Sequence, residues 1–177
     1  MRRFVPGLTL ALLLAGGTAT PATGQIGFVL GGGATIPMGD FGDFAATGWM
    51  ALAGAKLGLP LLPIQFRVEG LYGQNAHDGP TTDKTNLYGG MANVIFQIGP
   101  PLVPVKPYLI AGGGYLNHKF SPGNSGLPAA DEWKPVFGGG VGVSVSLMVI
   151  AVFVEARYLR RDDTGFIPIM AGFRLGG

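Results

Sequence analysis

The chain has 177 residues and combines many glycines with little charge: 32 residues are Gly, 14 are Pro, and only 12% are Asp, Glu, Lys or Arg. Hydrophobic residues make up 47% of the chain. This excludes an intrinsically disordered protein, because disordered chains are poor in apolar residues and rich in charge. The absence of Cys excludes a disulfide scaffold, and the length suits one domain with a sizeable core.

The first 24 residues have the layout of a secretory signal peptide. Arg2 and Arg3 form a basic start, an apolar run covers residues 8–15, and small residues follow up to Gly24. The apolar run is too short to span a bilayer as a helix. We therefore expect cleavage near Gly24–Gln25, with a signal peptide over residues 1–24 and one mature domain over residues 25–177.

The mature part is electrically neutral and has none of the motifs of common enzyme classes. Without Arg2 and Arg3, ten basic residues face ten acidic ones, so nucleic-acid binding has no support. No 18 apolar residues run together there, which excludes transmembrane helices. Nucleotide-binding loops, zinc-ligand spacings and nucleophile elbows are also missing. We therefore expect no cofactor and no bound metal.

After residue 24 the sequence alternates with a period of two. Between residues 137 and 147, Gly or Ser occupies every even position, whereas most odd positions carry Val, Phe or Leu. A helix cannot produce this pattern, but a strand with two unlike faces does. Similar alternation predicts eight strands, at about 25–36, 47–58, 64–74, 85–98, 106–118, 133–147, 150–160 and 166–175.

The connections between these strands alternate in length and polarity. Those after the even strands are short and uncharged, whereas those after the odd strands are longer and polar. Eight of the ten acidic residues lie in the longer connections or at their edges: Asp40, Asp43, Asp78, Asp83, Asp131, Glu132, Asp162 and Asp163. The pattern predicts an all-β fold, an eight-stranded antiparallel up-and-down transmembrane barrel with acidic loops at one end.

Polar residues at alternate strand positions are expected inside the barrel, where eight strands leave room only for side chains. The motif V-E-x-x-Y occurs at residues 68–72 and again at 154–158, half a barrel apart. We expect an internal polar network that is structural, with a narrow conduit for water or ions as the alternative. Its expected members are Lys56, Arg67, Glu69, Asn93, Gln97, Glu155, Arg157 and Arg174.

Aromatic residues near the predicted strand ends are expected on the outer surface. This placement is typical of the aromatic girdles that lie at the two interfaces of a membrane. The residues concerned are Phe28, Trp49, Tyr72, Tyr88, Phe96, Phe137, Tyr158, Phe166 and Phe173.

Four segments, in this order and spacing, resemble the small eight-stranded outer-membrane β-barrel proteins of Gram-negative bacteria, the OmpA-like and OmpX-like barrel domains. They are T-I-P-M-G-D-F at 35–41, P-Y-L-I-A-G-G-G at 107–114, E-A-R-Y at 155–158 and G-F-R-L at 172–175. The resemblance implies a location in the outer membrane, contact with its lipids and lipopolysaccharide, and insertion by the barrel-assembly machinery. The resemblance also implies an aromatic residue at the end of the last strand, which that machinery recognises, and here Leu175 stands in its place, followed by Gly176 and Gly177.

We therefore expect a structural or surface-interaction role, which is membrane integrity, surface adhesion, or binding of an extracellular ligand through the acidic loops. Three alternatives are a small-solute channel, a lipid A-modifying enzyme and a secreted lipocalin-like carrier. The enzyme would need converging His, Ser and carboxylate groups, but only His77 and His118 occur, and Ser121 is too far from His118 for the tight His-x-Ser arrangement. A lipocalin-like carrier needs an apolar interior for its ligand, whereas the alternation places the charged residues Lys56 and Glu69 inside the barrel.

The acidic residues of the loops could also gather divalent cations that bridge lipopolysaccharide phosphates.

Overall fold

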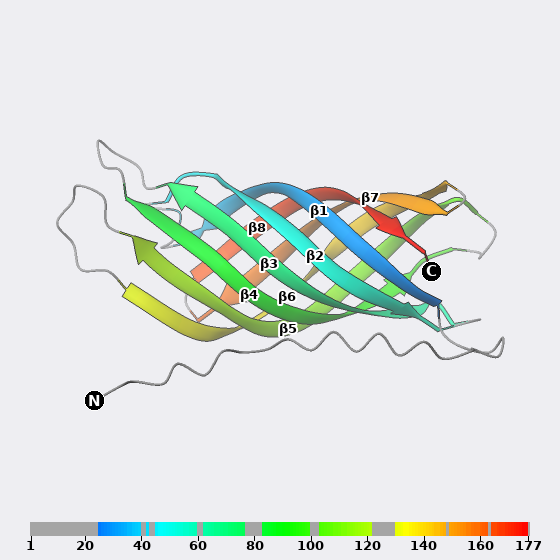
Figure 1. Ribbon diagram of the computed structural model, residues 1–177, viewed down its shortest axis with the longest axis horizontal. Coiled ribbons are helices and arrows are strands. Elements are labelled where there is room, and N and C mark those ends of the chain that lie inside the picture. Colours follow the sequence, from blue (N-terminus) through cyan, green and yellow to red (C-terminus); the bar gives the residue numbers. More distant parts are fainter. Residues whose placement is uncertain are drawn as a thin grey trace, which may run out of the picture.

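A computed structural model describes residues 25–39, 42, 45–59, 62–76, 83–99, 103–121, 130–147, 149–162 and 164–176. These residues form one closed barrel of eight antiparallel strands, in which each strand pairs with the next and β8 pairs with β1 (Figure 1). The strands are β1 Gln25–Met38, β2 Gly48–Gly58, β3 Ile64–Ala76, β4 Lys84–Gln97, β5 Val105–Ser121, β6 Ala130–Leu147, β7 Ile150–Arg161 and β8 Thr164–Leu175. The expected signal peptide, residues 1–24, lies outside the described residues. Among those described, no helix is long and apolar enough to cross a membrane.

The predicted order of eight antiparallel strands is confirmed, and the largest differences are at β5 and β6. These two strands continue well into the polar segment that we assigned to a loop, where His118 pairs with Glu132 and Lys119 with Asp131. Antiparallel pairing joins backbone groups and does not depend on apolar side chains. For this reason the polar composition of residues 119–132 led to predicted strand ends that are too early for β5 and too late for the start of β6.

The strands are strongly staggered around the barrel. A path through directly paired residues leaves β1 at Phe28 and returns to β1 at Met38, ten residues further along. It passes through Phe28, Ala55, Val68, Ala92, Gly113, Phe137, Arg160, Gly165 and Met38. Stagger of this kind requires strands that tilt relative to the barrel axis, and the ribbons in Figure 1 run obliquely.

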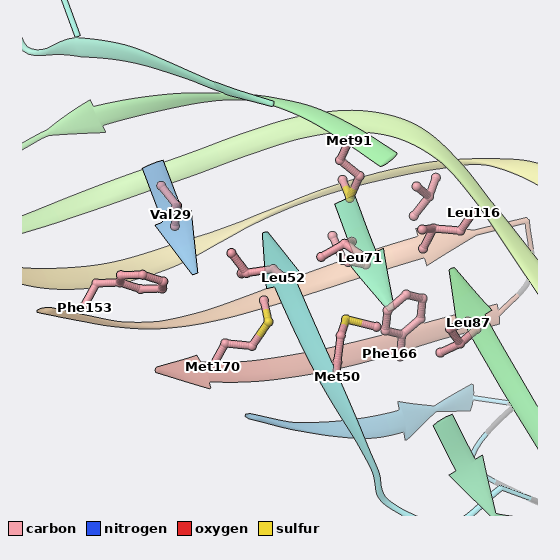
Figure 2. Close-up of a cluster of buried hydrophobic side chains, with 12 residues drawn as sticks. Val29, Met50, Leu52, Leu71, Leu87, Met91, Leu116, Phe153, Phe166 and Met170 are labelled. Atoms are coloured by element: carbon pink, nitrogen blue, oxygen red, sulfur yellow. The ribbon is translucent and has the colours of Figure 1, made fainter. Parts of the chain in front are cut away.

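The connections after β1, β3, β5 and β7 define the long-loop end of the barrel, and those after β2, β4 and β6 define its short-turn end. A cluster of apolar side chains fills much of the lumen, and most of its members lie towards the long-loop end (Figure 2). The cluster consists of Val29, Met50, Leu52, Leu71, Leu87, Met91, Leu116, Val136, Phe153, Leu159, Phe166 and Met170. The expectation of a polar interior therefore describes only part of the lumen.

Inward-facing glycines allow neighbouring strands to approach closely. A Cβ atom at Gly140 would lie 2.1 Å from the backbone oxygen of Ala156, and at Gly142 it would meet the ring of Tyr108 at 2.3 Å. By contrast, the nearest atom to a Cβ at the outward-facing Gly90 is 3.5 Å away. Glycine is thus a steric requirement on the inner face of β6 but not on the outer face of β4.

We expect Gly140→Val to lower the yield of folded barrel sharply, whereas Gly90→Val folds like the parent protein. Forcing extra atoms into a packed interior typically costs about 1–3 kcal/mol, and here the obstacle is backbone rather than a mobile side chain. The measurement is the fraction of refolded protein that migrates as the compact band on an unheated SDS gel. Equal fractions for the two variants would contradict the steric requirement.

Candidate functional site

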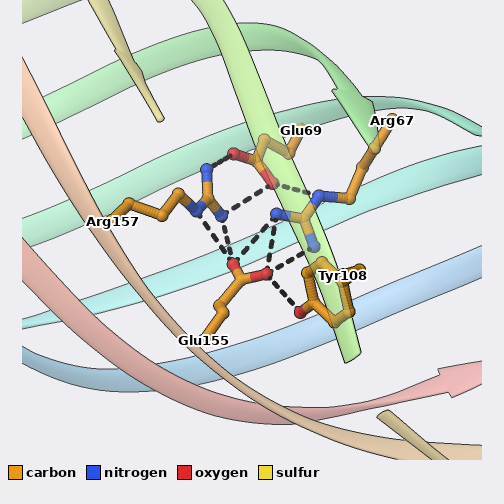
Figure 3. A network of polar contacts seen from close by, with 5 residues as sticks. All are labelled: Arg67, Glu69, Tyr108, Glu155 and Arg157. Carbon is orange, nitrogen blue, oxygen red and sulfur yellow. Dashed lines mark hydrogen bonds and ion pairs between the residues drawn. The ribbon is translucent and has the colours of Figure 1, made fainter. Parts of the chain in front are cut away.

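Four charged side chains meet inside the barrel, Arg67 and Glu69 from β3 and Glu155 and Arg157 from β7 (Figure 3). Within each pair the residues are two apart, so strand alternation turns both to the same, inner face. All four are buried, with at most 3% of each residue exposed. Because β3 and β7 are on opposite sides of the closed barrel, the side chains join across the lumen.

Each arginine of this network contacts both carboxylates. Arg67 donates from Nη2 to Glu155 Oε1 at 2.9 Å and from Nη1 to Glu155 Oε2 at 3.1 Å. Its Nε lies 2.8 Å from Glu69 Oε2, an ion pair without hydrogen-bond alignment. Arg157 donates from Nε to Glu155 Oε1 at 2.9 Å and from Nη2 to Glu69 Oε2 at 3.2 Å. The Tyr108 hydroxyl completes the network by donating to Glu155 Oε2 at 2.7 Å.

The network is electrically neutral, with two positive and two negative charges. Burial of such charges is tolerated only when each finds partners of good geometry, and charge-assisted bonds of this kind are stronger than those between neutral groups. The oxygens of Glu155 already accept bonds from Arg67, Arg157 and Tyr108. The arrangement can therefore hold opposite walls of the barrel together, but it leaves no carboxylate free for acid–base chemistry.

The other expected interior residues lie outside this network. Lys56 and Asn93 are buried at 3% and 4% exposure, and Gln97 and Arg174 are half-buried. Lys56, Gln97 and Arg174 line a small cavity on the short-turn side of the ion pairs. The structure thus brings four of the eight expected residues into one network and places three others together beside it.

Two residues of this region, Tyr108 and Gln65, are not among those predicted from the sequence. Tyr108 belongs to the network, and Gln65 is buried in the wall of the same cavity. Alternation could have found both, because Gln65 is two residues before Arg67 on β3 and Tyr108 is two residues before the buried Ile110 on β5. An isolated Tyr near a strand end was instead compatible with an interfacial position.

Most of the expected outer aromatic residues lie on the outer surface. Exposed positions are found for Phe28, Trp49, Tyr72, Phe96, Phe137, Tyr158 and Phe173, and Tyr88 is half-buried. The prediction that Phe166 lies on the outer surface is wrong, because this residue is fully buried in the apolar part of the lumen. The reason is parity, because Phe166 and Arg174 are an even number of residues apart on β8 and share its inner face.

The outer aromatic residues differ between the two ends of the barrel. Three exposed residues, Phe66, Tyr115 and Trp133, had not been assigned to the surface. The Tyr88 ring meets Trp133 edge-on with 5.5 Å between ring centres. Trp and Tyr lie towards the long-loop end, at Trp49, Tyr72, Tyr88, Tyr115, Trp133 and Tyr158, whereas Phe28, Phe66, Phe96 and Phe173 lie towards the short-turn end.

The groups considered for lipid A chemistry do not converge in the described part of the chain. His118 packs inside the barrel, with its ring centre 6.4 Å from that of Phe166. Ser121 is on the opposite face of β5, where its Oγ accepts a hydrogen bond from Asn86 at 3.4 Å. His77 lies outside the described residues. Within them, no group of three or more His, Asp or Glu side chains is arranged to hold a metal ion.

No protein-family model matches the chain, and no curated protein matches it. The similar solved structures include three that are matched over most of their own length. Neisserial surface protein A is 18% identical with a TM-score of 0.65, covering 85% of this chain and 96% of the other. Ail of Yersinia pestis, in complex with the heparin analogue sucrose octasulfate, is 16% identical with a TM-score of 0.59, covering 88% and 99%. The N-terminal β-barrel domain of Pseudomonas aeruginosa OprF is 15% identical with a TM-score of 0.51, covering 87% and 99%. The chain therefore has the fold of the small eight-stranded outer-membrane β-barrels.

Proposed function

We propose that the protein resides in the bacterial outer membrane and has a structural or surface-interaction role there, without enzymatic activity. The observation that supports this most directly is the outer surface of the barrel, where large apolar side chains are exposed on every strand. Phe28, Val68 and Val141, for example, are 65%, 64% and 58% exposed. Water-soluble proteins rarely expose contiguous apolar surface of this extent, whereas a lipid-facing strand requires it.

The lumen favours this role over the channel and the carrier. Buried apolar and polar side chains fill the long-loop side, the ion pairs close the middle, and the cavity beyond them has a volume of about 10 Å³. That space holds about one water molecule. A conducting pore needs a continuous aqueous path, and a carrier needs room for a ligand.

We propose that the long-loop end faces outward and touches lipopolysaccharide, while the barrel-assembly machinery inserts the chain. Trp and Tyr side chains at this end suit an interface, because one part of each ring system is apolar and another part is polar. Lys84, Lys119 and Arg160 are exposed on the outer face of the same end. Their positive charges suit the phosphate groups of lipopolysaccharide.

For an extracellular ligand, the charges at the long-loop end favour a cationic partner. Ail was solved with a sulfated heparin analogue, which supports ligand binding by barrels of this shape. In the present chain, however, eight acidic residues lie in or beside the long loops against the five basic residues Lys84, Lys119, Lys134, Arg160 and Arg161. Lys134 is itself paired with Glu132 at 3.1 Å and Asp162 at 2.8 Å.

Cell fractionation tests the proposed location. We expect the mature protein to sediment with outer membranes, to need detergent for extraction, and to migrate differently on SDS gels before and after heating. A lipid-facing outer surface and a closed barrel explain the second and third results. Recovery of the folded protein from the periplasm without detergent would contradict the proposal and revive the carrier.

A further inference from the structure

Two basic side chains at the short-turn side of the lumen have no counter-ion among the described residues. Lys56 on β2 and Arg174 on β8 flank β1 from either side, where Lys56 is opposite Gly27 and Arg174 is opposite Val29. Lys56 is only 3% exposed. Among the described residues, neither side chain has a hydrogen-bond or ion-pair partner.

The carboxylates of the described residues are committed elsewhere. Glu69 and Glu155 neutralise Arg67 and Arg157 within the network, and the remaining acids lie at the long-loop end: Asp83, Asp131, Glu132 and Asp162. Lys56 and Arg174 therefore give the lumen a surplus of positive charge. A buried charge without a partner is unfavourable, so a small anion bound at this end of the lumen would be stabilised.

The unpaired cations line one small cavity. Lys56, Arg174 and Arg67 share its wall with Gln65, Gln97 and Tyr108. One amide atom of Gln65, Oε1, is buried without a partner. The cavity volume of about 10 Å³ admits one water-sized group.

We propose that this cavity binds a single small inorganic anion, chloride, between Lys56 and Arg174. The surplus of positive charge favours an anion, and a cavity of about 10 Å³ favours a monatomic anion over larger ones. Access is from the short-turn end, where Arg174 and Gln97 are half-buried. The site does not depend on the proposed surface role, because it is built entirely from residues inside the barrel.

Unfolding of the complete mature barrel in detergent tests the site. The midpoint of the unfolding transition is measured at constant ionic strength while gluconate is replaced by chloride. Gluconate is the reference anion because it is too large for the cavity. A ligand that binds only the folded state raises the midpoint in a saturable manner. We expect this rise in the parent protein, its loss in Lys56→Met, and its retention in Lys134→Met, which removes an exposed cation at the opposite end.

If Lys56→Met does not fold, Arg174→Gln is the second variant for the same comparison. Crystals soaked in bromide give an independent readout, with an anomalous peak expected between Lys56 Nζ and the Arg174 guanidinium. The proposal is overturned by a parent midpoint that does not respond to chloride, by a response of equal size in the Lys56 variant, or by bromide bound only elsewhere.

Discussion

Replacing Arg157 with Met is expected to lower the free energy of unfolding by about 3–5 kcal/mol, because removing one member of a buried ion-pair network leaves an uncompensated charge. Arg157 contacts both Glu69 and Glu155, and its side chain is 1% exposed. After the loss of Arg157, Arg67 is the only positive charge left in the network for the two carboxylates. The free energy is measured by urea titration of the barrel folded in lipid vesicles.

Two further variants separate charge imbalance from loss of packing. The double variant Arg157→Met with Glu69→Gln is neutral, so we expect it to recover a substantial part of the lost stability. Lys134→Met removes ion pairs whose members are partly exposed to solvent, and such pairs contribute little. If Arg157→Met were no more damaging than Lys134→Met, the network would not be a major source of stability.

Replacing Val141 with Arg is expected to destabilise the folded barrel by about 2–4 kcal/mol in a lipid bilayer, which is the cost of a basic side chain at the lipid-facing midplane. Val141 faces outward with 58% exposure, and on β6 it lies between Phe137 and the strand end at Leu147. Its paired neighbours on the two sides are Leu109 and Ala156. This position is therefore far from either interface.

The matched control is Ala76→Arg, at the exposed long-loop end of β3. Near an interface the same basic side chain costs only about 0–1 kcal/mol, so the two variants should differ clearly when both are measured in the same vesicles. In a water-soluble barrel both positions would accept Arg with little effect. Equal stability of the two variants would therefore contradict the transmembrane orientation.

The strands could be predicted from the sequence because their inner and outer faces carry unlike residues. Alternation identified the eight strands, and the recurring V-E-x-x-Y motif drew attention to Glu69 and Glu155. It did not predict that these residues share Arg67 and Arg157 across the lumen, because that contact depends on β3 and β7 facing each other in the closed barrel. The spacing of residues along one strand does not indicate which residues of the opposite strand they contact across the lumen.

The apolar half of the lumen escaped prediction for a different reason. Where Leu71 or Met91 faces inward and Tyr72 or Val94 faces outward, both faces of the strand are apolar, so hydrophobicity alone does not distinguish lumen from lipid. Parity counted from a charged inward residue resolves the ambiguity. Counting back from Arg174 along β8 places Phe166 inside, as found.

The unequal distribution of aromatic residues bears on how the barrel would adapt to bilayers of different thickness. Indole and phenol groups at the long-loop end can donate hydrogen bonds to lipid headgroups, which anchors that end at one depth. The Phe side chains at the short-turn end have no polar group, so their depth is set by apolar contact alone. A thinner or thicker bilayer would then be accommodated mainly at the short turns, leaving the height of the long loops above the outer surface unchanged.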